Sequence, residues 1–364
     1  MMPSRIARFF NWGRQAATVP SMDGALRPNQ ALDGARPLAA VDAPDNLVAA
    51  EDGLYFTSGA QLFQLNRNFD HETIEKHRFE SDITALAAAA DGSLAVATAP
   101  GGIVLRGGPH DGKTIAALGG KPLIAVTALA FAGPDNLLVA VGSTVNAAAD
   151  WQADLLDGRT SGAVWRVDLR SLEAVQLAGN LGYPCGLLAD GDRIVVSEAW
   201  RHRLIALAAD GRGAPRVLLD DLPGYPGRLS PATGAGAWLS VFAPRSQLIE
   251  FVLQEASYRR WMMQEVDKAY WIAPSLRAGR SFKEPMQGGA VKTLGIHKPW
   301  SPTRSYGLAV RLNGDFVPTR SFHSRADGRR HGVTSCIETD GRLVLTCRGD
   351  NVVVALDLDG NGEA

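Results

Sequence analysis

One cysteine stands where its side chain could either do chemistry or fill space. In YPCGLLADGDRIVVSEAWRHRL, residues 183–204, Cys185 begins a short apolar strand that is followed by an Asp-Gly turn and a second strand. A thiolate is a nucleophile and a metal ligand, whereas a buried thiol behaves as a small apolar side chain. The chain has two further cysteines, Cys336 and Cys347, and no CxxC pair. This spacing predicts neither a disulfide framework nor a zinc knuckle, and reduced thiols favour a reducing compartment, the cytoplasm.

The composition narrows the class of protein that must position such residues. The 364 residues are 46% hydrophobic and 21% charged, with a net charge of -1, so we expect a large core and no nucleic-acid partner. The 39 glycines and 20 prolines are spread between many short apolar runs, which predicts an all-β protein with frequent turns. No run of about 18 apolar residues occurs, so we expect no transmembrane segment.

The first 35 residues differ from the rest. Arg5, Arg8 and Arg14 precede the first acidic residue, and charge interrupts the apolar positions, so no signal-peptide core is present. We expect residues 1–35 to form an N-terminal arm that is poorly ordered or helical. The alternative is a short amphipathic segment that touches a membrane surface or another protein.

An internal repeat begins near residue 40. Each copy has an apolar strand, a tight turn and a second apolar strand, and the six copies are DNLVAAEDGLYFTSG, ITALAAAADGSLAVATA, VTALAFAGPDNLLVAVG, CGLLADGDRIVVSEA, GRLSPATGAGAWLSVFA and VTSCIETDGRLVLTC. The copies are about 40–55 residues apart, except for a gap about twice as long before the last. This period predicts a six-bladed β-propeller over residues 36–360. We expect a strand near residues 36–42 to close the ring by pairing with residues 352–358.

The long gap predicts an insertion in blade five, over about residues 246–304. In residues 246–272, apolar side chains recur at three-to-four spacing, which indicates helix. A basic connection rich in glycine and proline follows, from Arg277 to Arg304. Such an insertion either covers one mouth of the ring or packs on its outside. Its aromatic residues, like the N-terminal arm, could contact a membrane or a protein partner.

Three segments resemble a known family. LGYPCGLLADGDRIVVSEAWRHRLIAL, LDDLPGYPGRLSPATGAGAWLSVFAPRSQLIEFV and HGVTSCIETDGRLVLTC are similar to successive blades of strictosidine synthase-like proteins. That family groups with paraoxonases and gluconolactonases among calcium-dependent six-bladed propellers. The phrases SEAWRHRL and LPGYP carry most of the resemblance, which covers about residues 40–360. It implies the propeller fold and, less directly, an enzyme.

The resemblance implies a calcium ion on the propeller axis, held by oxygens at the heads of the innermost strands. At Asp45-Asn46, where the family usually has an acidic pair, one carboxylate remains. The chain departs from the family where Asn or Asp-Asn is usual, with Thr127, Cys185 and Gly227-Arg228. Calcium takes about six to eight hard oxygen donors, and a thiol and a guanidinium are poor substitutes. We therefore expect no metal and no other cofactor, and an ion pair between Arg228 and Asp45 in place of the ion.

The resemblance also fixes where a condensing enzyme would keep its base. Strictosidine synthase uses a glutamate at the head of the last inner strand, and Thr334 aligns there. Because a threonine hydroxyl is no general base near neutral pH, strictosidine synthesis is not expected.

The aligned positions together predict a channel mouth lined by Asp45, Asn46, Thr127, Cys185, Arg228, His331 and Thr334. In an enzyme, His331 would be a general base, Cys185 a nucleophile of lowered pKa, and Arg228 the group that holds a carboxylate or oxyanion. The other four would bind substrate. The alternatives are a small buried cysteine, a capping histidine and a structurally paired arginine.

Two functions remain open at this point. The first is a hydrolase-like enzyme that acts on an ester or lactone of a small hydrophobic molecule in the axial pocket, without the usual calcium ligands. The second is a non-catalytic propeller that binds a small molecule or a protein.

Overall fold

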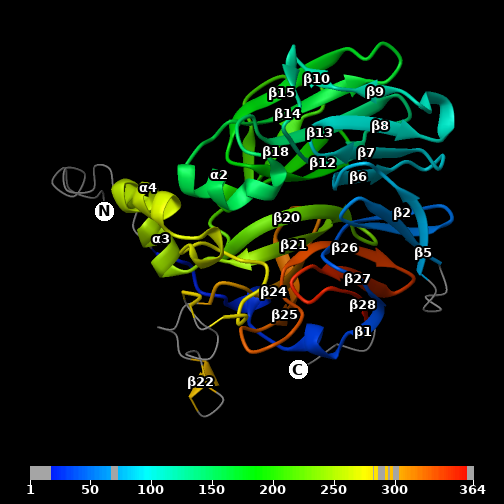
Figure 1. Ribbon diagram of the computed structural model, residues 1–364. Coiled ribbons are helices and arrows are strands. Elements are labelled where there is room, and N and C mark those ends of the chain that lie inside the picture. The colour runs from blue at the N-terminus through cyan, green and yellow to red at the C-terminus, as the bar shows by residue number, and fades with distance from the viewer. Residues whose placement is uncertain are drawn as a thin grey trace, which may run out of the picture.

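The computed structural model describes residues 18–66, 73–281, 283–285, 292–293, 296–297 and 303–358. Six four-stranded antiparallel sheets follow one another round a common axis (Figure 1). The first strand of each of these sheets contacts the first strands of both neighbouring sheets, so these six strands form the inner wall of the ring. The chain is a six-bladed β-propeller, as the repeat predicted.

Each blade runs from the axis outward. Blades one to three comprise β2 Pro44–Ala50, β3 Gly53–Ser58, β4 Gln61–Leu65 and β5 Thr73–Arg78; β6 Ile83–Ala88, β7 Leu94–Thr98, β8 Gly102–Arg106 and β9 Thr114–Ile115; and β12 Ala125–Phe131, β13 Asn136–Ser143, β14 Gly162–Asp168 and β15 Ala174–Leu181. Blades four and five comprise β16 Pro184–Asp190, β17 Arg193–Glu198, β18 Arg203–Ala208 and β19 Arg216–Leu219; and β20 Gly224–Pro231, β21 Ala237–Pro244, β24 Gly307–Leu312 and β25 Pro318–Ser324. Short hairpins β10 Ala117–Leu118 with β11 Lys121–Pro122, and β22 Lys292–Thr293 with β23 Ile296–His297, lie between blades or within the insertion.

Blade six contains both ends of the propeller. It pairs β26 Val333–Thr339, β27 Arg342–Cys347 and β28 Val352–Asp357 with β1 Arg36–Ala40, which runs antiparallel to β28 with Arg36 opposite Ala355. The predicted closure of the ring is confirmed. Because the first and last parts of the propeller share one sheet, the ring cannot open without breaking that ladder.

The six repeated sequences form the two inner strands of the six blades. Their turns need residues that tolerate a left-handed backbone, and in blade six Asp340 and Gly341 take φ values of 48° and 72°. Two consecutive positive φ values match the twist of a tight hairpin, which is why the turns could be located in the sequence.

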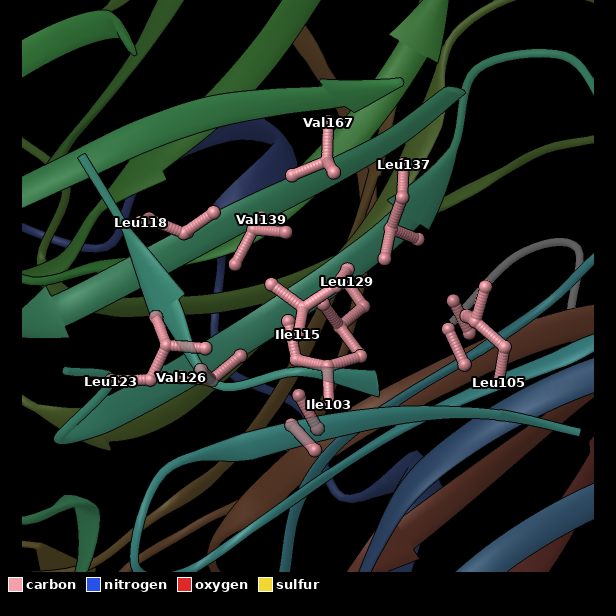
Figure 2. Close-up of a cluster of buried hydrophobic side chains, with 14 of the residues drawn as sticks. Ile103, Leu105, Ile115, Leu118, Leu123, Val126, Leu129, Leu137, Val139 and Val167 are labelled. Atoms are coloured by element: carbon pink, nitrogen blue, oxygen red, sulfur yellow. The ribbon is translucent and has the colours of Figure 1, made fainter. Parts of the chain in front are cut away.

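The core lies between blades rather than in one centre. Figure 2 shows the contact between blades two and three, where Ile103, Val126, Leu137 and Val139 meet from facing sheets. Leu137 and Val139 are fully buried, and each such side chain contributes about 1.5–3 kcal/mol to folding. Similar clusters between the other blades keep the inner strands at fixed positions round the axis.

The three α-helices in the described part of the chain lie on one side of the ring (Figure 1). α2 Trp151–Asp157 connects β13 to β14, whereas α3 Gln247–Gln254 and α4 Ala256–Glu265 belong to the insertion between β21 and β24. α3 begins at Ser246, whose Oγ accepts a hydrogen bond from the Ile249 N–H at 3.2 Å. The helical part of the predicted insertion is thus confirmed. None of the described helices is long and apolar enough to cross a membrane.

The described part of the N-terminal segment, residues 18–35, contains two single turns, η1 Gly24–Leu26 and η2 Ala31–Gly34, which contact β25. Asn29 donates to the Ser321 carbonyl at 2.9 Å, and Ser324 donates to Asp33 at 2.7 Å. These bonds hold residues 18–35 against blade five. The remainder of the predicted arm, residues 1–17, lies outside the described residues.

Candidate functional site on the propeller axis

Each innermost strand has an irregularity at the level where the sequence predicted a site. The pairing register shifts in all six inner hairpins, and the residues at the shifts are Asn46-Leu47, Thr84, Thr127, Cys185, Gly227-Arg228 and Thr334. A β-bulge leaves one residue outside the ladder and re-aims its side chain. The bulges of blades two to six therefore place side chains at one level around the axis, and in blade one Asp45 lies directly before the bulge.

A cavity of about 260 Å³ lies at this ring. All six blades contribute to its wall, and five of the seven predicted residues line it: Asp45, Thr127, Cys185, Arg228 and Thr334. Asn46 is 1% exposed and lies directly behind them, bonded to Arg228. The sequence therefore located the axial position in five of the six blades.

The centre of the ring is an arginine surrounded by oxygens. Arg228 Nη1 donates to Asp45 Oδ1 at 2.7 Å and to the Thr334 carbonyl at 3.5 Å. Its Nη2 donates to Asn46 Oδ1 and, at 3.1 Å, to the Thr84 carbonyl. The predicted pair of Arg228 with Asp45 is confirmed. Four oxygens from three other blades thus converge on one guanidinium, which links blades one, two, five and six.

Asp45 is shared between two arginines. Its second oxygen accepts from Arg348 Nη1 at 2.9 Å, and its first also accepts from the Asn46 N–H at 2.7 Å. Burial alone would raise the pKa of Asp45, but the charges of Arg228 and Arg348 outweigh burial and lower it. Asp45 is therefore a carboxylate at neutral pH, with both oxygens engaged.

These residues do not fit a calcium ion. The carboxylate, amide and carbonyl oxygens that would suit the ion already accept hydrogen bonds from the cationic Arg228, and the blade-four position offers only sulfur. No group of three histidine, cysteine, aspartate or glutamate side chains suited to a metal occurs in the described part of the chain. A guanidinium occupies the place on the axis where the family resemblance puts a divalent cation.

Cys185 acts as a hydrogen-bond donor between blades. Its Sγ lies 3.0 Å from the Pro226 carbonyl in blade five, and Thr127 Oγ1 donates in the same way to the Pro184 carbonyl at 2.5 Å. Burial raises the pKa of the Cys185 thiol to about 11, so the protonated form predominates at neutral pH. The lowered pKa that a nucleophile would need is not found, because burial outweighs the opposing effects of the Ser197 hydrogen bond and the Arg228 charge.

His331 is not among the residues that line the axial cavity, contrary to the prediction. Gly332, with a φ of 64°, turns the chain between His331 and the start of β26 at Val333. Its Nδ1 lies 2.8 Å from Ser305 Oγ and its Nε2 lies 2.8 Å from the Arg325 carbonyl. Burial lowers the pKa of His331. The neutral imidazole of His331 therefore connects two loops by hydrogen bonds.

Aromatic residues form one side of the cavity. Tyr183, Trp151 and Phe242 line it, and Tyr183 stacks at 4.5 Å on Trp200. Trp200 donates from Nε1 to the buried Asp154 at 2.8 Å, which fixes its ring. Trp200 belongs to the phrase SEAWRHRL, so that phrase supports the wall of the cavity rather than supplying a reacting group.

The insertion contributes to the wall as well. Leu276 lines the cavity, and its backbone lies so close to Gly349 that a Cβ on this glycine would be 2.0 Å from the Leu276 carbonyl oxygen. Only glycine permits this approach. The segment after α4 therefore packs against blade six and covers part of the axial cavity.

Several cavity residues were not predicted from the sequence, among them a threonine, a carboxylate and a second arginine. Thr84 occupies the bulge of blade two, Asp82 lies just before it, and Arg348 follows the second strand of blade six. Thr84 could have been found, because ITAL in blade two repeats the pattern of VTAL in blade three. Arg348 had no such signal, since it follows the second strand rather than the first.

Comparisons with known proteins agree with this fold. No family model matches the chain. It is 23% identical to the adipocyte plasma membrane-associated protein of Danio rerio over 48% of the chain, and 22% identical to that of Salmo salar over 56%. These matches span only 37% and 44% of the relatives' own lengths.

Solved propellers resemble the chain over most of its length. A gluconolactonase from Xanthomonas campestris has a TM-score of 0.55 at 15% identity, covering 95% of this chain and 99% of that one. A putative gluconolactonase has a TM-score of 0.54 at 12% identity, covering 89% of this chain and 91% of that one. The calcium-binding regucalcin of Agrobacterium tumefaciens has 0.51 at 12%, covering 88% and 92%. At these identities the likeness concerns the fold alone.

Proposed function

We propose that the axial cavity binds a small molecule that combines an apolar body with an anionic or strongly polarised oxygen. The observation that carries this is Arg348. Among the described residues, its guanidinium hydrogen-bonds only to Asp45, and its side chain is 43% exposed on a wall that also includes Trp151, Tyr183 and Phe242. A guanidinium and aromatic side chains that line one cavity can recognise an oxygen and an apolar ring of the same molecule.

Binding fits the predicted residues better than covalent catalysis does. Cys185 is protonated at neutral pH and donates to a carbonyl, and His331 lies outside the cavity. Arg228 has both terminal nitrogens engaged with protein oxygens. The predicted nucleophile, base and oxyanion group are therefore not assembled into one reacting unit.

The proposal is tested by blocking the cavity. Ala149 lines it from the blade-three loop and is exposed, so Ala149→Trp should fill the cavity without disturbing the fold. We expect small arenecarboxylates and aryl lactones to bind the parent protein in calorimetry and to bind the variant at least about tenfold more weakly, a difference of about 1.4 kcal/mol. The matched control is Ala116→Trp, an exposed alanine of blade two outside this cavity. Equal affinity for all three proteins would refute the proposal.

A second candidate is hydrolysis of an ester or lactone in the same cavity. It is favoured by Asp82, an exposed carboxylate that lines the cavity together with Arg348. A carboxylate can take a proton from water while a cation stabilises the oxyanion that forms. Solved structures titled as gluconolactonases share the fold, which makes lactones the first compounds to assay.

The two candidates are separated by turnover. An arylester and lactone panel should be run with and without a chelator, on the parent protein and on Asp82→Asn. Hydrolysis that survives the chelator and falls at least about a hundredfold in Asp82→Asn would establish the second candidate. Binding without turnover would leave the first.

A further inference from the structure

A second, wider cavity of about 580 Å³ lies directly against the axial cavity. Trp151, Leu276 and Arg348 line both. We call the wider cavity the vestibule. A ligand with its apolar body in the axial cavity would reach the vestibule past these three side chains.

The vestibule has an excess of positive charge. Two acidic residues line it, Asp42 and Glu284, against five cationic ones: Lys268, Arg277, Arg280, Arg304 and Arg348. Three of the cations have acidic neighbours, since Lys268 lies 2.7 Å from Asp150, Arg304 lies 3.9 Å from Glu284 and Arg348 lies 2.9 Å from Asp45.

The other two cations are the exposed Arg277 and Arg280, neither of which forms an ion pair with another described residue. Both belong to the basic connection of the insertion, for which neither the fold nor the proposed function gives a reason. Positively charged side chains around one concave surface raise the local concentration of anions. A guanidinium also pairs with carboxylate or phosphate through two parallel hydrogen bonds.

We propose that the ligand is an amphipathic anion. Its apolar body occupies the axial cavity, and its anionic oxyacid head lies in the vestibule on Arg277 and Arg280, with Arg348 at the junction. This inference rests on the proposed function, because it assigns the class of the molecule that the axial cavity binds. It also gives a role to the insertion, which supplies both the cover over the axis and the charge beside it.

The test compares three probes that share one apolar body: phenylpropanol, phenylpropanoate and phenylpropyl phosphate. Calorimetry at about 0.05 M salt should give affinities for the anions about 3–30-fold above that of the alcohol, the range for one or two ion pairs open to solvent. At about 0.5 M salt the advantage should shrink, since screening acts on exposed charges. The carboxylate and phosphate arms show which head is preferred.

The double variant Arg277→Gln/Arg280→Gln should abolish the advantage of the anions and leave binding of the alcohol unchanged. The matched control, Arg212→Gln/Arg216→Gln, removes two exposed cations of blade four, outside both cavities, and should leave all three affinities as they are in the parent protein. Equal thermal midpoints of the variants and the parent protein verify the fold.

Three other results would overturn either this inference or the proposed function on which it rests. Binding of the alcohol with no gain for either anion overturns the inference and leaves the proposed function standing. An advantage of the anions that survives the double variant, or that the control also loses, overturns the placement of the head in the vestibule. Failure of all three probes to bind, or equal binding to Ala149→Trp, refutes the proposed function itself.

Discussion

Replacing Arg228 by methionine should destabilise the propeller by about 3 kcal/mol at neutral pH, because it leaves a buried carboxylate with one of its two cations missing. Removing one partner of a buried ion pair costs about 3–5 kcal/mol. The lower end applies here, since Asp45 keeps Arg348 at 2.9 Å, while the Asn46 amide oxygen and the Thr84 carbonyl lose a donor.

The contribution of the pair can be isolated with a double-mutant cycle. Asp45→Asn/Arg228→Met removes the carboxylate charge together with its partner. The double variant should therefore lose about 2 kcal/mol less unfolding free energy than the two single variants lose in total. The assay is urea unfolding followed by tryptophan fluorescence. Arg348→Met is the matched control, because this guanidinium pairs with the same carboxylate but is 43% exposed, and its loss should cost only about 0.5–1 kcal/mol.

The pH dependence has a definite sign. In the parent protein the pKa of Asp45 is lowered, so its contribution to stability is present above the unfolded value of about 3.9 and is lost as the pH falls through the folded value. Without Arg228, burial is opposed less and the folded pKa rises, so the deficit of the variant should shrink between pH 7 and about pH 4.5. A deficit below about 1 kcal/mol, or a coupling near zero, would refute the view that Arg228 substitutes for an axial ion.

Three further predictions concern the surroundings of the site. Glu198→Gln should lower the free energy of unfolding in urea by about 3 kcal/mol, because this fully buried carboxylate accepts hydrogen bonds from Arg201, Arg203 and the Gly182 N–H, each at 2.6 Å. The control Glu265→Gln, at an exposed position, should have no effect, and equal effects of the two variants would contradict the prediction. A chromogenic disulfide reagent at about pH 7 should label under about 0.1 thiol per native chain and all 3 thiols in urea, since burial raises the pKa of Cys185 to about 11; rapid native labelling would restore the cysteine as a candidate nucleophile. Adding calcium or a chelator should move the thermal midpoint by less than about 1 °C, and a rise of several degrees with calcium would reveal a site that Arg228 does not exclude.

The architecture could be predicted because each of its determinants is local in the sequence. The first five turns recur at a spacing that fits one blade, and the turn at Asp340-Gly341 follows after the insertion. β1 then pairs with β28 to complete the last blade. The pair of Arg228 with Asp45 was also predictable, since a cation and a carboxylate aligned to the same level of one narrow axis must meet.

The rest of the site depends on loops that the repeat does not specify. His331 lies only two residues before β26, yet the turn at Gly332 carries it away from the axis. Leu276 reaches the cavity because Gly349 lacks a side chain, a contact between residues far apart in the chain. The pKa of Cys185 likewise depends first on burial between the blades, which is not visible in the sequence around it.

The six bulges have a consequence for how such a molecule can change. A residue outside the ladder is not required to pair, so its side chain can differ between blades without changing the register of the strands that hold it. Here threonine, cysteine and arginine occupy equivalent bulges of four blades. The axis therefore has six equivalent positions, one per blade, at which the chemistry of the cavity wall can change while the strand pairing that builds the propeller stays the same.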